Sequence, residues 1–275
     1  MNPYLVEGPA VISFSGGRTS GYMLAKIVEA HGGKLPDDVI PIFANTGKEH
    51  EKTLEFVQAC SERIAPVTWI EYGGRVDGKK THRIVDFATA SRNGEPFAKL
   101  IEERKYTPNI VARFCTVELK IRPMHRYVRE LGWDSWSSCV GIRADEPRRV
   151  AKLRARAGAE TKDEYAFPPL ADAGVSKHDV LAFWEAMPFE LDLPIAPDGD
   201  TWGGNCDLCF LKGMHKRIAL IRAEPHRAEW WAQQEEKVGG SFRGDQPTYR
   251  QLIHIATQPT LNFESEDIAD CACTD

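Results

Sequence analysis

Short apolar runs alternate with segments of helical apolar spacing along the first third of the chain. The runs at residues 10–14, 39–43 and 67–70 are typical of buried strands. Between them, residues 21–31 and 50–64 have the spacing of amphipathic helices, and paired glycines close the first of these. Strands that alternate with helices imply crossover connections. The pattern therefore predicts an α/β fold with a Rossmann-like, mainly parallel sheet and helices on both faces.

The later part of the chain is less regular. Residues 73–112 are polar and rich in glycine and proline, so we expect loops over the site with one or two short helices. Pro123 marks a kink or restart in a helix at residues 116–131, which precedes a strand at 135–142. The remaining expected helices are at residues 148–157, 176–186, 212–222 and 226–237, with no regular structure beyond. We expect a nucleotide-binding domain over residues 1–200 and a helical, cysteine-bearing C-terminal region over residues 201–275.

Composition indicates an ordinary globular protein, because 42% of the 275 residues are hydrophobic and 27% are charged. A formal net charge of -5 argues against wholesale coating of nucleic acid but allows a local basic groove. No apolar run approaches the roughly 20 residues that cross a bilayer. The N-terminus lacks the basic start and apolar stretch of a signal peptide. We therefore expect a cytoplasmic protein with no membrane partner.

A glycine-rich loop, SGGRTS at residues 15–20, lies between the first expected strand and helix. Its glycines let backbone N–H groups approach an anion, and the helix N-terminus adds its positive dipole end. The same pattern by itself also suits a tight turn. A rival segment at residues 73–80, GGRVDGKK, nearly matches another phosphate-loop pattern, but Lys80 stands where a Mg²⁺-binding hydroxyl is needed. We interpret this rival as a chance match.

Four motifs in order carry a resemblance to a known family. SGGRTS resembles the PP-loop signature of the adenine-nucleotide α-hydrolase superfamily. ANTGKE, at residues 44–49, resembles the second-strand motif of the phosphoadenosine phosphosulfate (PAPS) reductase-like family within it. CTVELKIRPM at 115–124 and GIRADE at 141–146 resemble later motifs of that family. The resemblance covers residues 10–215.

The resemblance implies an adenine nucleotide, ATP with Mg²⁺, bound at the C-terminal ends of the strands. The residues that it implies for the phosphates are those of the loop: Ser15, Gly16, Gly17, Arg18, Thr19 and Ser20. Asn45, Thr46 and Gly47 would approach the nucleoside. Lys120 and Arg143 would act in catalysis by offering cations to the phosphates or to developing charge.

The intact loop resembles that of the ATP-splitting members, which implies cleavage between the α and β phosphates to activate a substrate, followed by sulfur transfer from a sulfur donor. A thiol-dependent PAPS or adenosine phosphosulfate reductase remains the alternative, with Cys271 or Cys273 attacking the sulfonate. We take Cys273 as the candidate, although the tail DCACTD departs from the reductase pattern. A non-catalytic zinc module that binds nucleic acid is a second alternative.

The chain has seven cysteines, and they fall into two kinds. Cys60 and Cys139 stand alone in apolar settings and are expected to be buried. The C-x-x-C at residues 206–209 resembles that of the iron–sulfur adenosine phosphosulfate reductases, which have an adjacent Cys-Cys where this sequence has Cys115 and Thr116. The candidate metal ligands are Cys115, Cys206, Cys209 and Cys271. A [4Fe–4S] cluster, zinc and free thiols remain open.

Basic residues crowd the region from Arg143 to Arg156. They are Arg143, Arg148, Arg149, Lys152, Arg154 and Arg156. One interpretation is a solvated helix face with one phosphate-contacting arginine. The other is a docking strip for tRNA or DNA, because Lys and Arg supply contacts to sugar–phosphate backbones.

Overall fold

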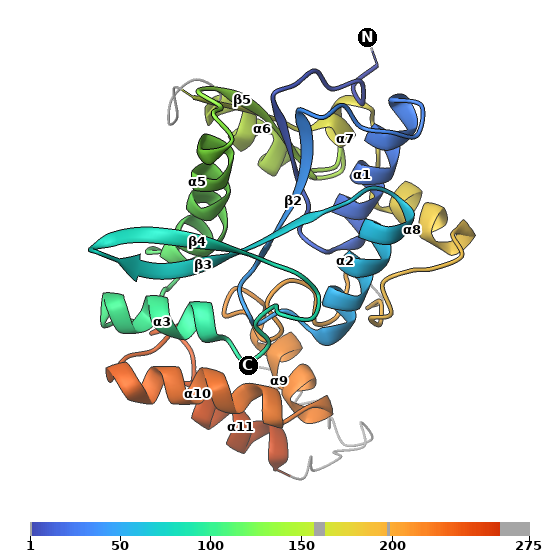
Figure 1. Ribbon diagram of the computed structural model, residues 1–275. Helices are drawn as coiled ribbons and strands as arrows, with labels where there is room; N and C mark the ends of the chain where they lie inside the picture. The colour runs from blue at the N-terminus through green and yellow to red at the C-terminus, as the bar shows by residue number, and fades with distance from the viewer. Residues whose placement is uncertain (1, 157–162, 197–198, 259–275) are drawn as a thin grey trace, which may run out of the picture.

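The computed structural model describes residues 2–156, 163–196 and 199–258, and a six-stranded sheet lies at its centre (Figure 1). The strands, in sheet order, are β4 (Lys79–Val85), β3 (Thr68–Val76), β2 (Val39–Asn45), β1 (Ala10–Ser13), β5 (Trp136–Val140) and β6 (Glu164–Phe167). The β3–β4 pair is antiparallel and the other pairs are parallel. The expected mainly parallel α/β fold is confirmed.

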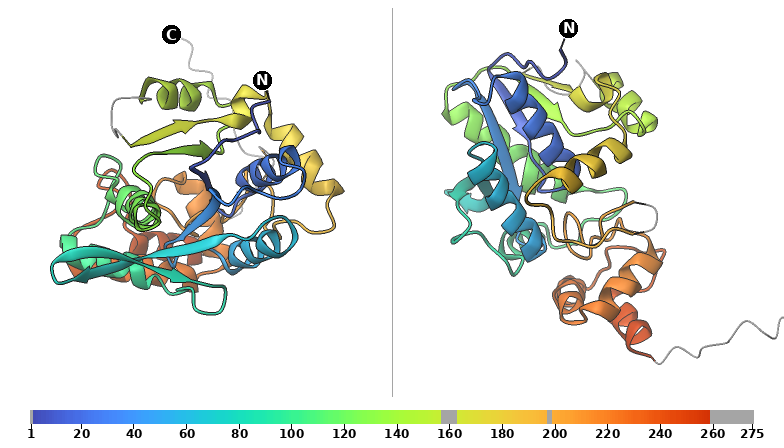
Figure 2. Two further views of the ribbon diagram at one scale, coloured as in Figure 1. Left: turned by 45° about the horizontal axis from the view of Figure 1, so that its top comes forward. Right: turned by 90° about the vertical axis from the view of Figure 1, so that its right-hand side faces the viewer.

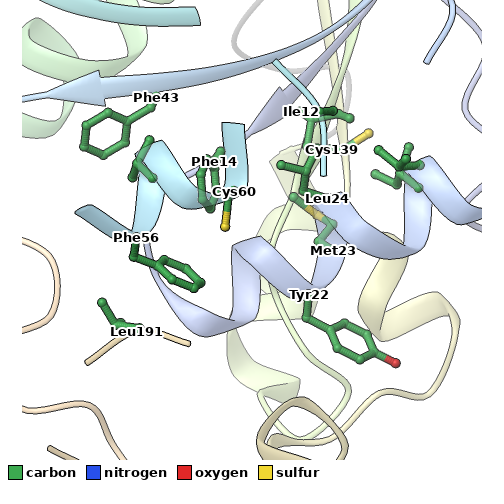
Figure 3. Packing of buried hydrophobic residues seen from close by; sticks show 14 of the residues in the cluster. Ile12, Phe14, Tyr22, Met23, Leu24, Phe43, Phe56, Cys60, Cys139 and Leu191 are labelled. Atoms are coloured by element: carbon green, nitrogen blue, oxygen red, sulfur yellow. The ribbon is translucent and has the colours of Figure 1, made fainter. Parts of the chain in front are cut away.

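Helices cover both faces of the sheet. On one face lie α1 (Arg18–Ala30), α2 (Glu51–Arg63) and α8 (Lys177–Ala186), and on the other lies α5 (Arg122–Glu130). Successive side chains of a strand point to opposite faces of the sheet, so each strand contributes to both layers. Ile12 packs towards α1 and α2, whereas its neighbour Val11 packs with Val128 of α5. Cys60 and Cys139 are fully buried in the first of these cores, as expected (Figure 3).

The C-terminal region is helical and shares an apolar core with the main body. It consists of α9 (Met214–Ala223), α10 (His226–Val238) and α11 (Tyr249–Thr257), which lie below α3 (Glu95–Arg104) in Figure 1 and at one end of the molecule in Figure 2. Phe97 and Leu100 of α3 pack in one cluster with Trp231 and Leu252. The sequence prediction missed α11, because we expected no regular structure there.

The segment at residues 73–80 forms part of a β-hairpin. Asp77 and Gly78 adopt φ angles of 50° and 74°, as an Asp-Gly turn between antiparallel strands requires. A phosphate loop needs a strand before it and a helix after it, so the interpretation of GGRVDGKK as a chance match is confirmed. The sequence prediction of loops over residues 73–112 was wrong for this hairpin, which lies at the sheet edge, and right for the short helix α3.

The helix expected at residues 116–131 is divided into three parts. They are α4 (Phe114–Thr116), the π-helical turn η1 (Val117–Ile121) and α5. Pro123 lies in the first turn of α5, directly after the π-helical turn. Lys120 therefore lies on a π-helical turn, a feature that often marks functional sites.

Two short elements complete the described chain, α6 (Pro147–Arg156) and α7 (Pro169–Asp172). The strand β6, which follows α6, was not predicted, because a strand of four residues with none fully buried gives little periodic signal. Among the described helices, none has the length and apolar character needed to cross a membrane.

Candidate functional site

The SGGRTS loop joins β1 to α1 and leaves the start of the helix free of a side-chain cap. Gly17 is the N-cap residue, and because glycine has no side chain it cannot accept a hydrogen bond from the first N–H groups of the helix. The loop is closed by its serines, since the Ser15 N–H donates to Ser20 Oγ at 3.1 Å and the two hydroxyls lie 3.0 Å apart. The first N–H groups of a helix have no partner within the helix, and the dipole favours an anion there. This is the geometry of a phosphate cradle.

The two glycines of the loop have different structural roles. Gly16 has φ of +75°, and a Cβ there would lie 2.7 Å from the Thr53 methyl and 2.9 Å from a Val57 methyl. Gly17 is extended, and a Cβ there would come no closer than 3.7 Å, to Ser15 Oγ. Packing against α2 thus requires the first glycine, whereas packing places no such requirement on the second.

Arg18 is buried, and its guanidinium holds the segment that follows α8. It donates to the carbonyl oxygens of Leu191 and Leu193, the latter at 2.9 Å, and to Thr201 Oγ1 at 3.1 Å. Sequence reasoning placed Arg18 among the phosphate contacts. The structure instead brings it to backbone carbonyls more than 170 residues along the chain, and no local sequence signal indicated that partner.

Replacing Arg18 with alanine should destabilise the fold. The change leaves buried carbonyl oxygens without donors, so we expect a loss of about 2–4 kcal/mol in the free energy of unfolding, measured by urea denaturation. Lys26→Ala, which removes an exposed ion pair on the same helix, is the control and should change stability little. An Arg18→Ala protein of unchanged stability that has lost ATP binding would show that the guanidinium serves phosphate instead.

The GIRADE motif meets the loop at the end of β5. Arg143 Nη1 donates to Thr19 Oγ1 at 3.2 Å, and its Nε donates to Asp145 at 2.8 Å. Gly141 lies next to Ser20 of the loop, and a Cβ there would make an ordinary contact, 3.5 Å from Ser20 Cα. The first and fourth sequence motifs thus form one site, and Arg143 is the cation that the structure places at the loop.

The Asn45 side chain stabilises the turn after β2 through three hydrogen bonds. Its amide nitrogen donates to Glu71 Oε1 at 2.6 Å and to the Ser91 carbonyl at 2.8 Å, and its Oδ1 accepts the Gly47 N–H at 3.2 Å. The residue is fully buried. Gly47 is required by the same turn, since its φ is +77° and a Cβ would press on the Gly94 backbone at 3.1 Å. These two residues shape the turn that carries Thr46.

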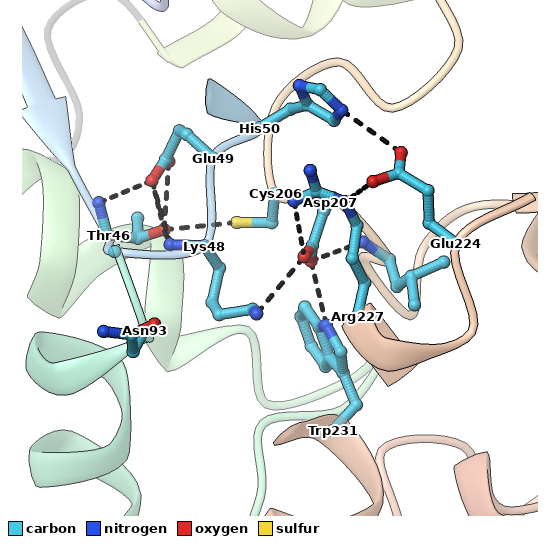
Figure 4. Close-up of polar contacts among 12 residues, drawn as sticks. Thr46, Lys48, Glu49, His50, Asn93, Cys206, Asp207, Glu224, Arg227 and Trp231 are labelled. Carbon is cyan, nitrogen blue, oxygen red and sulfur yellow. Dashed lines mark hydrogen bonds and ion pairs between the residues drawn. The ribbon is translucent and has the colours of Figure 1, made fainter. Parts of the chain in front are cut away.

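The second-strand motif is connected to the C-x-x-C segment by a polar network (Figure 4). The Thr46 hydroxyl donates to Glu49 and lies 3.5 Å from Cys206 Sγ. Lys48 forms a buried ion pair with Asp207 at 3.2 Å. Sequence reasoning assigned no role to Lys48, Glu49 or Asp207, which lie within the ANTGKE motif and the C-x-x-C segment.

Lys120 lies between this network and the thiols. Its Nζ is 3.8 Å from Glu49 Oε1. Burial favours the neutral amine, but the Glu49 carboxylate and the nearby thiols outweigh it and raise the pKa of Lys120 above its usual value. Lys120 therefore carries a positive charge at neutral pH.

Cys115, Cys206 and Cys209 come from distant parts of the chain and pack against one apolar cluster. Burial, followed by the Glu49 charge, raises the pKa of Cys206 to about 12, and burial also raises the pKa of Cys115. Among the described residues, no three His, Cys, Asp or Glu side chains are grouped to hold a metal ion. Cys271 and Cys273, expected as ligand and catalytic thiol, lie outside the described residues.

The basic region on α6 is partly neutralised. Arg149 pairs with Glu146, and Arg154 pairs with Asp172 at 2.6 Å. Arg148 and Lys152 are exposed. The side chain of Arg156 lies outside the described residues.

The doubly covered parallel sheet, with a glycine-rich anion cradle after its first strand, defines a nucleotide-binding α/β protein. The model of the phosphoadenosine phosphosulfate reductase domain matches residues 9–187. The chain therefore belongs to the phosphoadenosine phosphosulfate reductase domain family.

Two phage proteins are similar in sequence. The nin region protein ORF290 of Escherichia phage lambda is 33% identical over 215 residues, which are 75% of this chain and 67% of that protein. The 37.8 kDa protein encoded in the gpa 5′ region of Escherichia phage 186 is 26% identical over 176 residues. That match covers 51% of this chain and 49% of the relative, so the chain spans about half of its length.

Two solved structures are similar at low identity. One is the phosphoadenylyl-sulfate reductase of Candida auris in its phosphate complex, with 17% identity and a TM-score of 0.43 over 69% of this chain and 82% of that one. The other is the U34-tRNA thiolase of Methanococcus maripaludis with its [4Fe–4S] cluster, with 17% identity and a TM-score of 0.39 over 97% of this chain and 77% of that one.

Proposed function

We propose that the protein binds ATP with Mg²⁺ and cleaves it between the α and β phosphates to activate a substrate for sulfur transfer. The observation that carries the proposal is the intact phosphate cradle, in which the uncapped start of α1 and the Arg143 guanidinium meet at Thr19. A loop that only turned the chain would not require a half-buried arginine to reach it from the end of another strand.

The chemistry requires alignment and charge stabilisation more than a dedicated base. A substrate oxygen attacks the α-phosphorus, the bond from that phosphorus to the oxygen bridging to the β-phosphate breaks, and pyrophosphate leaves with the electron pair. The N–H groups at the start of α1 and Arg143 hold the phosphates, and Lys120 offers a second cation to the developing charge. Mg²⁺ would neutralise phosphate charge when bound.

The proposal is tested with ATP labelled in the α-phosphate, Mg²⁺ and a cell extract fractionated into RNA, DNA and small molecules. We expect AMP and pyrophosphate in equal amounts, and no product when Mg²⁺ is chelated. Formation of ADP and phosphate, or no turnover with any fraction, would contradict the proposal. Release of pyrophosphate would also exclude the non-catalytic zinc module.

Thiol-dependent reduction of a sulfonucleotide is the second candidate, and the family match favours it. A thiolate of Cys273 would attack the sulfonate sulfur, so that the nucleotide leaves and a sulfonated cysteine forms, which a second thiol then resolves. Consumption of PAPS with a dithiol donor and no turnover of ATP would establish this reaction. A Cys273→Ser protein would then lose it.

We propose that Cys115, Cys206, Cys209 and Cys271 hold a [4Fe–4S] cluster, with zinc as the alternative. The support is that the Cys115 segment and the C-x-x-C segment, which are far apart in sequence, bring the first three thiols against one apolar cluster. Cys206→Ser should abolish visible absorption and bound iron in anaerobically purified protein. Cys139→Ser, at a buried cysteine distant from the others, is the control and should retain both. Colourless protein with stoichiometric zinc would support the alternative.

The proposed partners are an adenine nucleotide, a sulfur donor and, as acceptor, tRNA or DNA. The region from Arg143 to Arg156 is the docking strip that the sequence suggests. Its exposed cations Arg148 and Lys152 support a contact, whereas the pairing of Arg149 and Arg154 reduces the charge available for one.

A further inference from the structure

A second group of cations surrounds one buried carboxylate, that of Glu118 on η1. Glu118 Oε1 accepts from Lys80 at 2.5 Å, from Arg104 at 2.7 Å and from Arg122 at 2.7 Å. The Glu118 side chain is 1% exposed, whereas Arg104 and Arg122 are 37% and 53% exposed. The carboxylate thus lies beneath the guanidinium groups, which reach solvent.

The positive charge of this group is not balanced by its own carboxylate. Arg126, whose charge interacts with Glu118 and Arg122, brings the cations to four. In the part of the chain that the structure describes, Glu103 already binds Tyr72 and Arg75, and Glu130, which lies 3.5 Å from His82, also interacts with Arg126. Glu118 and Glu130 together offset two of the four cations, so the group keeps an excess of positive charge. Like charges held this close repel one another, so an anion that joins them is favoured.

Three separate elements place these cations together. Lys80 comes from the β3–β4 hairpin, Arg104 from the end of α3 and Arg122 from the start of α5. The hairpin lies between α3 and α5 in Figure 1. The turn η1, which carries Glu118, also carries Lys120 of the proposed reaction site.

An aromatic pair, of which Tyr106 is exposed and Phe114 is half-buried, adjoins the cations. The Arg104 guanidinium lies over the Phe114 ring at 5.4 Å, and Phe114 meets the edge of Tyr106 at 5.1 Å between ring centroids. Tyr106 is 44% exposed. Cations beside an accessible aromatic ring are what proteins use to hold single-stranded nucleic acid, because phosphates meet the charges while a base stacks on the ring.

We propose that Lys80, Arg104, Arg122, Arg126 and Tyr106 form a binding surface for the backbone and a base of a single-stranded nucleic acid. The delivery of that strand to the reaction site rests on the proposed function, but binding of the strand does not. A strand is favoured over a lone phosphate because the exposed Tyr106 ring adjoins the cations through Phe114, so a base can stack beside a phosphate that the cations bind.

The test measures binding of fluorescently labelled single-stranded RNA and DNA oligonucleotides by anisotropy, without ATP, over a range of salt concentrations. We expect Arg104→Ala/Arg122→Ala to weaken binding about tenfold or more and to reduce the slope of log affinity against log salt by about 1–2. Lys80 still pairs with Glu118 in this variant, so the carboxylate is not left without a cation. Tyr106→Ala should weaken binding about tenfold without changing the salt slope.

Arg129→Ala is the matched control, because Arg129 is equally exposed on α5 but forms a one-to-one pair with Asp163. It should bind like the wild type. Unchanged binding by Arg104→Ala/Arg122→Ala, or loss of binding only in Arg148→Ala/Lys152→Ala on α6, would overturn the proposal. The proposal would also be overturned if inorganic phosphate displaced the oligonucleotide when both supply the same concentration of phosphate groups. ATP cleavage is followed separately: wild-type protein that cleaves ATP but binds no oligonucleotide refutes this inference alone, and the converse refutes the proposed function alone.

Discussion

Gly17→Val should reduce ATP cleavage about a hundredfold or more while the protein remains folded. Gly17 is extended at φ −104° and ψ 162°, a conformation that valine adopts readily, and the nearest atom to a Cβ is 3.7 Å away. We therefore expect a change in unfolding free energy of no more than about 1 kcal/mol. The valine side chain nonetheless occupies the entrance to the first N–H groups of α1, where donors to a developing charge contribute about a hundredfold to a thousandfold each.

Gly16→Ala is the matched comparison at the preceding residue, and it should act through folding. A positive φ is strained for alanine, and its methyl would overlap Thr53 and Val57. We expect a loss of about 2–4 kcal/mol in urea denaturation. If Gly17→Val protein cleaves ATP at the wild-type rate, the loop is a structural turn and the phosphates are held elsewhere.

Lys120→Ala should lower the rate of ATP cleavage about a hundredfold with a smaller effect on ATP binding. The raised pKa keeps Lys120 charged at neutral pH, so the change removes a full positive charge from the site. Glu49 keeps the Thr46 hydroxyl and the Thr46 and Lys48 N–H groups as donors, so the fold should tolerate the loss. Single-turnover rates and ATP titrations separate the two effects.

Lys120→Arg should restore part of the rate, because it restores the charge with a different shape. Lys52→Ala is the control, since Lys52 is an exposed lysine that pairs with Glu55 and Asp192 on the surface. If Lys120→Ala protein cleaves ATP at the normal rate but no longer contains iron or zinc, then Lys120 serves the metal site at the thiols and not the phosphates.

The fold could be predicted where apolar periodicity was strong, and the failures have specific causes. Strand β4 escaped detection because it lies at the sheet edge with Ile84 facing solvent, and none of its residues is fully buried, so its apolar alternation is weak. Helix α11 was missed although its signal was present, since Thr248 and Gln251 form a capping box at its start. A search for that motif would have found the helix.

The candidate site could be predicted from its motifs but not from single side chains. Arg143 was expected to meet phosphates, and the structure places it on Thr19. Arg18 lies within the best motif of the chain, yet it binds carbonyls of a segment far along the sequence. Hydrogen bonds between residues far apart in the sequence depend on tertiary packing, so a local sequence pattern cannot predict them. The roles of the cysteines also depend on the tail beyond the described residues.

The apolar cluster shared by α3 and the C-terminal helices has a consequence for how the chain can be divided. Phe97 and Leu100 pack against Trp231 and Leu252, and Lys48 pairs with Asp207. A fragment that ended before the C-x-x-C would expose the apolar side chains of Phe97 and Leu100. It would also leave the buried Lys48 ammonium group without its carboxylate partner. We therefore expect the main body and the C-terminal region to unfold as a single cooperative unit. An exchange of the cysteine segment between relatives should succeed only if α3 is exchanged together with it.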